Sequence, residues 1–172
     1  LKEYFPAQDN RLPLSLRTAV AVSRWGLSSF VSSVTEFAVR SAARHFIAGE
    51  NLEEAIQSIR RLYHTGAAYT VDILGENTTS EAEADSYAQA YLDLIEGLEK
   101  AREDCGPVNI SIKPTSLYSQ FEPAAPEKTS KAVLKRLLPI CRRVIEAGGS
   151  ATIDMEQYCY REVILAIFRD LY

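Results

Sequence analysis

Three segments that are predicted as β-strands carry an ionisable residue at or near their carboxyl ends, and these residues are evenly spaced. The segments are AAYTVDIL, VNISIK and SATID, and their charged residues are Asp72, Lys113 and Asp154, which stand 41 positions apart in each case. Side chains alternate between the two faces of a strand, so each charged residue shares a face with polar or small neighbours. The opposite faces are mostly apolar and are predicted to pack against helices: Tyr69, Val71, Ile73, Val108, Ile110, Ile112, Ala151 and Ile153. Charges at the carboxyl ends of parallel strands are typical of α/β barrel active sites. The alternative is that three half-buried strands simply end in water.

The segments around these strands have the periodicity of helices. Apolar spacing and glycine stops predict helices over 29–48 and 51–65, with Asn51 as the cap of the second. Ser80 and Glu83 form a capping-box pattern for a helix over 80–104, and further helices are predicted over 131–147 and from about 160. Residues 114–130 are predicted to be an irregular loop. We expect a right-handed βαβ arrangement with a parallel sheet.

The predicted fold class is therefore α/β. A helical N-terminal segment over 1–66 is expected to precede the first three βα units of a (β/α)8 barrel over 67–172. Three strands do not close a barrel, which takes eight strands and about 250 residues. The sequence starts at Leu1, has Met155 as its only methionine, and stops within a predicted helix without a stop signal. We expect a piece of a longer protein.

Parallel pairing would place the three charged residues at one end of the sheet. Neighbouring strands lie about 4.8 Å apart, so Lys113 is expected between Asp72 and Asp154, with its ammonium within reach of at least one carboxylate. Carboxylates beside a partly buried lysine keep it protonated. Bulk composition points away from other classes: the net charge of −4 does not favour a nucleic-acid binder, and three cysteines without a CxxC pair are typical of reduced thiols in a cytosolic protein.

The two histidines are not expected to form a site. His45 and His64 lack convergent partner ligands, so we predict no metal site from them. A different barrel enzyme, a metal-dependent lyase or hydrolase that uses Asp72 and Asp154 as ligands, remains an alternative, as does a non-catalytic α/β fragment.

Four segments, taken in order, resemble the proline dehydrogenase family: RHFIAGENLEEAI, TVDILGE, NISIKPTSLYSQFEP and IDMEQYCYREVILAIF. Members of that family are FAD-dependent (β/α)8 barrels that occur alone or fused to an aldehyde dehydrogenase in bifunctional proline-utilisation proteins. The resemblance implies oxidation of L-proline to 1-pyrroline-5-carboxylate, with electrons passed to quinone. One departure is Pro114–Thr115, where the family more often has Leu-Ser or Leu-Thr.

The resemblance also implies roles for individual residues. Lys113 matches the lysine that contacts the substrate carboxylate, and Asp154 matches the aspartate that organises the charges of the active site. Asp72 and Glu76 match the pair around the first strand, with the glutamate able to pair with an arginine that gates the site. We assign no flavin contacts within this chain, because the family carries most of them on later strands. Residues 1–172 alone are expected neither to bind FAD tightly nor to oxidise proline.

The family's eighth helix carries an Arg-Arg-x-x-Glu motif for the substrate carboxylate. This chain contains a lookalike at Arg142, Arg143 and Glu146, between the second and third strands. There we predict an outer helix on which Arg142 and Glu146 form an ordinary surface pair one turn apart. The resemblance further implies a cytoplasmic protein with peripheral attachment to the inner membrane, or else one on the matrix side of the mitochondrial inner membrane.

Overall fold

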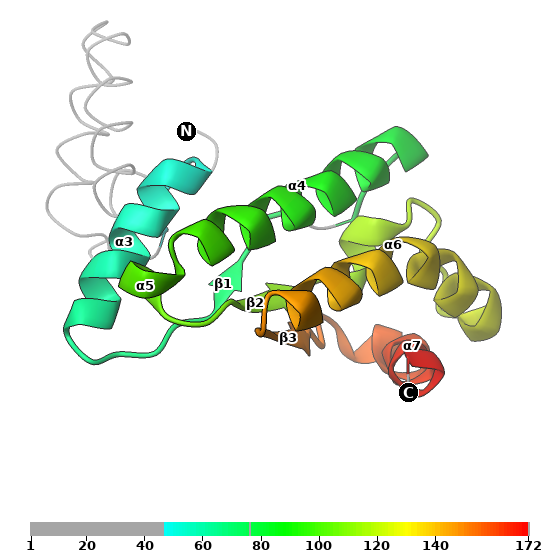
Figure 1. The fold of residues 1–172 in the computed structure, drawn as a ribbon. Helices are drawn as coiled ribbons and strands as arrows, with labels where there is room; N and C mark the ends of the chain where they lie inside the picture. The colour runs from blue at the N-terminus through cyan, green and yellow to red at the C-terminus, as the bar shows by residue number, and fades with distance from the viewer. Residues whose placement is uncertain (1–46, 76, 172) are drawn as a thin grey trace, which may run out of the picture. The chain divides into compact units, whose positions relative to one another are not determined.

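The computed structural model describes residues 47–75 and 77–171 (Figure 1). The chain divides into two compact units, 1–49 and 50–172, and the fold described here is that of the second. The helix predicted over 29–48 lies almost entirely outside the described residues. The helix expected at 51–65 is grouped with the second unit, whereas the predicted domain boundary after residue 66 stays a prediction.

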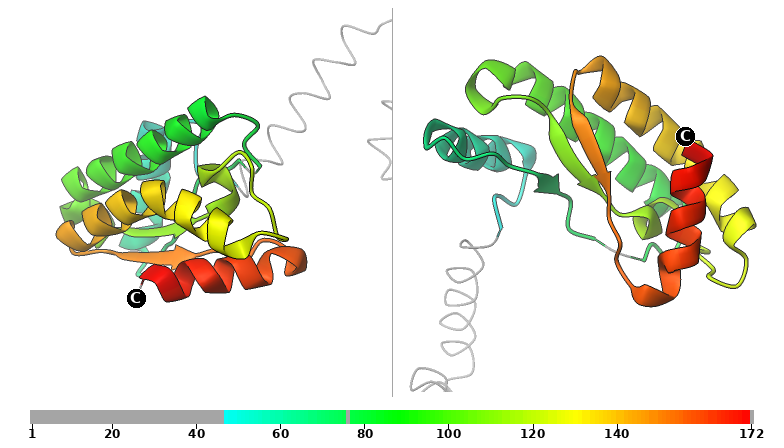
Figure 2. Two further views of the ribbon diagram at one scale, coloured as in Figure 1. Left: turned by 90° about the vertical axis from the view of Figure 1, so that its right-hand side faces the viewer. Right: turned by 90° about the horizontal axis from the view of Figure 1, so that it is seen from below.

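The second unit alternates strands and helices as expected. Its elements are α3 (Leu52–His64), β1 (Val71–Asp72), α4 (Glu81–Lys100), α5 (Arg102–Cys105), β2 (Asn109–Ile112), η1 (Pro114–Leu117), α6 (Pro126–Glu146), β3 (Ser150–Ile153), η2 (Tyr158–Tyr160) and α7 (Arg161–Leu171). The strands form one parallel sheet in the order β1-β2-β3, which confirms the predicted parallel pairing. Helices α4 and α6 lie on the same side of this sheet (Figure 2).

Helix boundaries follow local capping. The side chain of Asn51 accepts a hydrogen bond from the backbone N–H of Glu54 (3.0 Å), and Ser80 accepts one from Glu83 (3.2 Å), so both predicted caps are confirmed. Helix α6 begins at Pro126, five residues before the predicted start, because proline fits the first turn of a helix, where its missing N–H has no partner to lose.

Three further predictions were wrong. The helix expected over 80–104 is interrupted at Ala101, where it divides into α4 and α5. The first strand pairs only over Val71–Asp72, not over its whole apolar stretch. The loop expected to be irregular contains the 3-10 turn η1, which starts at Pro114.

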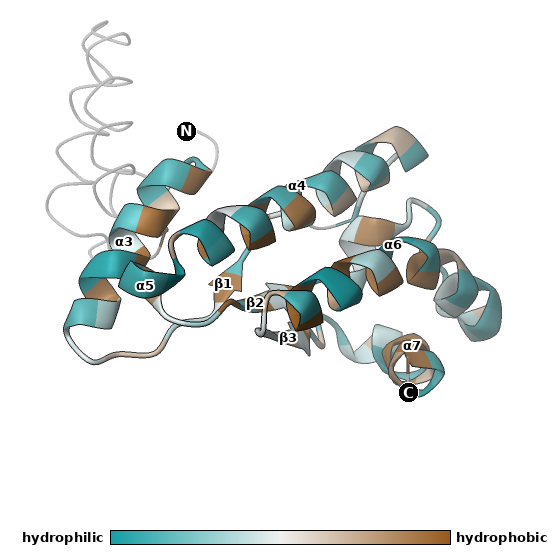
Figure 3. Cartoon of the chain, in the orientation of Figure 1, coloured by the Kyte–Doolittle hydropathy of each residue, from teal (hydrophilic) through white to brown (hydrophobic). Residues whose placement is uncertain are grey.

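The core lies between the sheet and its helices. Val108, Ile110 and Ile112 are fully buried, as the strand alternation predicted. Helices α4, α6 and α7 contribute the apolar side chains opposite them: Tyr91, Ile95, Leu98, Val133, Leu137, Ile140, Val163 and Ile167. Figure 3 shows the apolar segments of α4 and α6 turned toward the strands. None of the helices in the described part of the chain is long and apolar enough to cross a membrane.

Strand β3 lies at the edge of the sheet, and its surroundings differ from the prediction. Ala151 pairs in register with Ile110 yet is exposed, because an edge strand is covered less well than the central strand. At the entrance to β3, Gly149 is required by close packing: a Cβ at this position would lie 2.5 Å from the carbonyl oxygen of Val108.

Candidate active site

Asp72, Lys113 and Asp154 lie at the same end of the sheet. Asp72 is the last residue of β1, Lys113 follows the last residue of β2, and Asp154 follows the last residue of β3. The backbone N–H of Asp154 still donates to the carbonyl of Ile112 at 2.9 Å, which continues the ladder to this level. Lys113 is therefore placed between the two aspartates, and this geometric prediction is confirmed.

The Lys113 side chain is buried, with 7% of it exposed, and its ammonium forms an ion pair with the carboxylate of Asp72, which is 39% exposed. Burial alone would lower the pKa of Lys113, but the hydrogen bond and the charge of Asp72, with a smaller contribution from the charge of Asp154, raise it above its ordinary value. The lysine is thus a protonated cation with little access to solvent, and its partner carboxylate is partly exposed.

The backbone of Lys113 is fixed from two sides. Its N–H donates to the hydroxyl of Tyr91 at 3.1 Å, and burial raises the pKa of that fully buried tyrosine, which keeps the phenol neutral. Its carbonyl accepts hydrogen bonds from the backbone N–H (3.1 Å) and the hydroxyl (2.7 Å) of Ser116. Pro114 starts the turn η1 at a position where no N–H is needed, so the departure at Pro114–Thr115 is compatible with a well-packed turn.

Sequence reasoning missed Glu156 and Thr115. The carboxylate of Glu156 accepts hydrogen bonds from the hydroxyl (2.5 Å) and the backbone N–H (3.2 Å) of Thr115, a buried residue of η1. Each of these residues stands two positions beyond a charged strand end, Thr115 after Lys113 and Glu156 after Asp154. Their separation of 41 positions repeats the strand spacing, and that repeat is the signal in the sequence that points to them.

Of the other residues considered from the sequence, some fall outside the described residues and one lies at the end of α3. Glu76 is not among the described residues, and neither is His45. His64 is exposed at the end of α3. Within 47–75 and 77–171, no group of histidine, cysteine, aspartate or glutamate side chains is arranged to hold a metal ion.

The lookalike motif lies on α6, as predicted, but its ion pair differs. Arg143 pairs with Glu99 of α4, and the ion pairs of the described residues do not include the predicted one between Arg142 and Glu146. The reason is that α4 packs beside α6 and presents its own carboxylate to Arg143. Because the end of α6 leads directly into the start of β3, these arginines lie near the amino ends of the strands, opposite the charged cluster.

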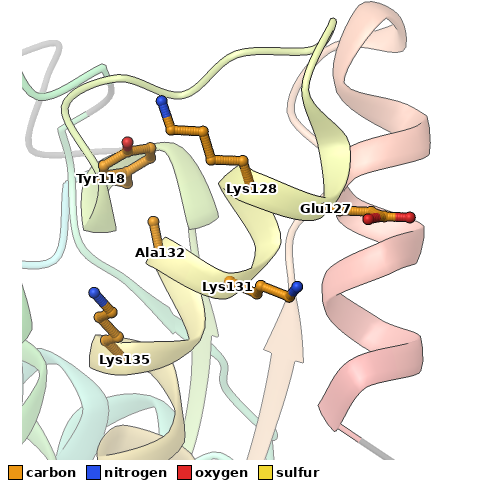
Figure 4. Close-up of a pocket in the computed structure, with 6 residues that line it drawn as sticks. All are labelled: Tyr118, Glu127, Lys128, Lys131, Ala132 and Lys135. Atoms are coloured by element: carbon orange, nitrogen blue, oxygen red, sulfur yellow. The ribbon is translucent and has the colours of Figure 1, made fainter.

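A pocket of about 510 Å³ lies at the start of α6 and does not include the strand-end residues (Figure 4). It is lined by Tyr118, Glu127, Lys128, Lys131, Ala132 and Lys135. Its three lysines are exposed, in contrast to Lys113. The strand-end cluster therefore stays the candidate active site.

Comparison with known proteins decides the family. The sequence profile of the family described as "Proline dehydrogenase" matches residues 55–172, more than half of the chain. The chain belongs to the proline dehydrogenase family. It is 30% identical over 141 residues to proline dehydrogenase 1 of Bacillus subtilis (strain 168), and this match covers 80% of the chain and 43% of that relative. It is 28% identical over 139 residues to the bifunctional protein PutA of Escherichia coli (strain K12), covering 79% of the chain and 10% of PutA.

Solved structures agree with this family assignment. The chain resembles proline utilization A from Bdellovibrio bacteriovorus, in a crystal structure of the protein inactivated by N-propargylglycine. The TM-score is 0.75 at 34% identity, and the match covers 83% of this chain and 16% of that one. A variant of proline utilization A from Bradyrhizobium japonicum gives a TM-score of 0.64 at 27% identity, covering 87% of this chain and 15% of that one. The chain thus spans less than half the length of each of these relatives.

Proposed function

We propose that the protein oxidises L-proline to 1-pyrroline-5-carboxylate, with FAD as the hydride acceptor and quinone as the final electron acceptor. The observation that carries the proposal is the buried ammonium of Lys113, paired with Asp72 at the carboxyl ends of three parallel strands in a chain of this family. Proteins named as proline dehydrogenases and as proline utilization A support it.

The charges of the cluster suit a zwitterionic substrate. Lys113 would bind the carboxylate of proline, and its pairing with Asp72 keeps it protonated for that task. One ammonium beside two carboxylates gives the cluster a net negative charge, which would also attract the cationic amine of the same substrate. A carboxylate ligand also needs cations from outside these three strands, in keeping with the arginines that the family resemblance implies elsewhere.

FAD, when bound, supplies the two-electron redox chemistry, while the protein supplies binding, orientation and electrostatics. The described residues fit only part of such a cofactor. The open face of the sheet offers half-buried polar side chains at Asn109 and Ser111 beside Lys113, which is compatible with the polar edge of a flavin ring. Asn109 and Ser111 are uncharged and offer no cation to the diphosphate. We therefore assign no flavin contact to a named residue.

The rest of the proposal follows from the family. The three βα units would form part of a (β/α)8 barrel whose remaining strands cover the open face of the sheet. The similarity to proteins named bifunctional PutA supports a fusion of this chain to an aldehyde dehydrogenase domain in the intact protein. We propose a cytoplasmic protein that contacts a membrane peripherally to reach quinone.

The proposal can be tested with purified intact protein, by its absorbance spectrum and its activity. We expect a flavin absorbance band and L-proline-dependent reduction of a soluble quinone analogue. Losing one charged contact to a buried carboxylate costs about 2–5 kcal/mol, so Lys113→Ala should raise the KM for proline strongly or abolish turnover while the protein stays folded. Lys135→Ala, which removes an exposed lysine of α6, is the matched control and should leave the kinetics unchanged. Near-normal kinetics in Lys113→Ala would remove Lys113 from the site.

The same sample separates the alternatives. A colourless protein whose activity depends on an added divalent metal would support the metal-dependent barrel enzyme, with Asp72 and Asp154 as ligands. A colourless protein without turnover would support a non-catalytic α/β segment. The family match favours neither of these.

A further inference from the structure

The segments that follow β2 and β3 are joined by one carboxylate, which accepts two hydrogen bonds. The carboxylate of Glu156 accepts from the hydroxyl of Thr115 at 2.5 Å and from its backbone N–H at 3.2 Å. We call this pair of hydrogen bonds the Glu156–Thr115 clasp. Thr115 is 1% exposed, so its hydroxyl and N–H have little access to water and depend on this carboxylate for their hydrogen bonds.

The clasp bridges the two sides of the charged cluster. Thr115 stands two residues after Lys113 in the turn η1. In that turn the hydroxyl of Ser116 donates to the carbonyl of Lys113, and the N–H of Lys113 donates to the hydroxyl of Tyr91. Glu156 stands two residues after Asp154, on the segment that leaves β3. The distance between the turn behind Lys113 and the segment behind Asp154 is therefore set in part by one carboxylate.

We propose that Glu156 is a positioning residue for the substrate: acting through Thr115, it fixes Lys113 relative to Asp154, and so fixes the distance between the binding points for the two charged ends of proline. This inference rests on the proposed function. Glu156 is not placed in contact with the reacting atoms. Its effect reaches the substrate through the turn, because small displacements of positioning groups lower the rate of a reaction that needs aligned partners.

The variants that test the clasp are Thr115→Val and Glu156→Gln in the intact protein. Thr115→Val removes the hydroxyl and keeps the shape, and Glu156→Gln replaces one of the two acceptor oxygens with an NH₂ group. A hydrogen bond to a charged group is a strong one, so we expect each variant to raise the KM for L-proline about tenfold and to lower kcat by less than about threefold. Thr115→Ser keeps both donors and should restore a KM close to that of the natural protein.

The double variant adds a second readout. If the clasp is one unit, Thr115→Val combined with Glu156→Gln should raise KM no further than the more affected single variant does. A double variant whose effect is the product of the two single effects would show that the residues act separately, and this would overturn the clasp.

A matched contact on the same loop serves as the control. Glu81 accepts hydrogen bonds from the backbone N–H (3.1 Å) and the hydroxyl (2.6 Å) of Ser119. These are the same two kinds of donor group as in the clasp, but the contact is exposed and stands farther from Lys113 along the chain. Ser119→Ala should leave KM unchanged. An equal rise of KM in Ser119→Ala would show general loosening of the loop and overturn the inference.

The outcomes also separate this inference from the proposed function. An active natural protein whose KM is unchanged in Thr115→Val and in Glu156→Gln overturns the clasp alone. A natural protein that holds flavin but does not oxidise proline overturns the proposed function, and the positioning role falls with it.

Discussion

The two faces of strand β2 differ in what surrounds them. On one face Ile110 and Ile112 are fully buried beneath the helices, whereas on the other Asn109 and Ser111 are only half-buried and lead to the charged end at Lys113. Apolar burial against helices stabilises the fold, and the opposite face keeps polar groups at a sheet edge where a ligand can reach them. Substitutions on the two faces should therefore separate effects on stability from effects on activity.

The largest effect on stability is expected on the helix-facing side. Ile110→Ala removes a fully buried side chain from the centre of the core, which should lower the free energy of unfolding by about 2–5 kcal/mol. Urea denaturation followed by circular dichroism measures it. Ser111→Ala, one position along on the other face, is the control and should cost less than about 1 kcal/mol. Equal losses in the two variants would mean that the faces do not differ in the way the burial indicates.

A smaller effect on stability is expected at the charged end. Asp72→Asn leaves the buried Lys113 ammonium without its anionic partner, which is costly for a buried charge. Because Asp72 itself is partly exposed, solvent screens the pair, and we expect a loss of about 1–3 kcal/mol in the free energy of unfolding at pH 7. The urea midpoint measures it, and an unchanged midpoint would show that the ion pair contributes nothing to the fold.

The loss of stability in Asp72→Asn should become smaller at high pH. The pKa of Lys113 is raised in the folded state, so its contribution is fully present below the pKa of the unfolded lysine, about 10.4, and is lost as the pH rises through the higher folded value. The difference between the natural protein and Asp72→Asn should be constant between about pH 7 and pH 9 and shrink above about pH 10.4. A difference that grows over the alkaline range would contradict the raised pKa.

The sequence predicted the features that depend on local pattern. Alternation placed Ile110 toward the helices and Lys113 at the sheet end, and the caps Asn51 and Ser80 were visible as motifs. The features it missed depend on how separate elements meet in space. The Glu156–Thr115 clasp requires the turn η1, and the pairing of Arg143 with Glu99 requires the packing of α6 against α4. Neither partner choice can be predicted from spacing along a single helix or strand.

The smallest effect is expected for the two arginines of α6. Arg142 and Arg143 reproduce an Arg-Arg-x-x-Glu pattern but lie on α6, near the amino ends of the strands and away from Lys113. A substrate carboxylate held at the carboxyl ends would not reach them. Arg142→Ala should therefore change neither the kcat/KM for L-proline nor the urea midpoint beyond experimental error, whereas Lys113→Ala should raise the KM strongly or abolish turnover. A rise in the KM of Arg142→Ala comparable to that of Lys113→Ala would place the substrate at the other end of the sheet and reverse the assignment of the two ends.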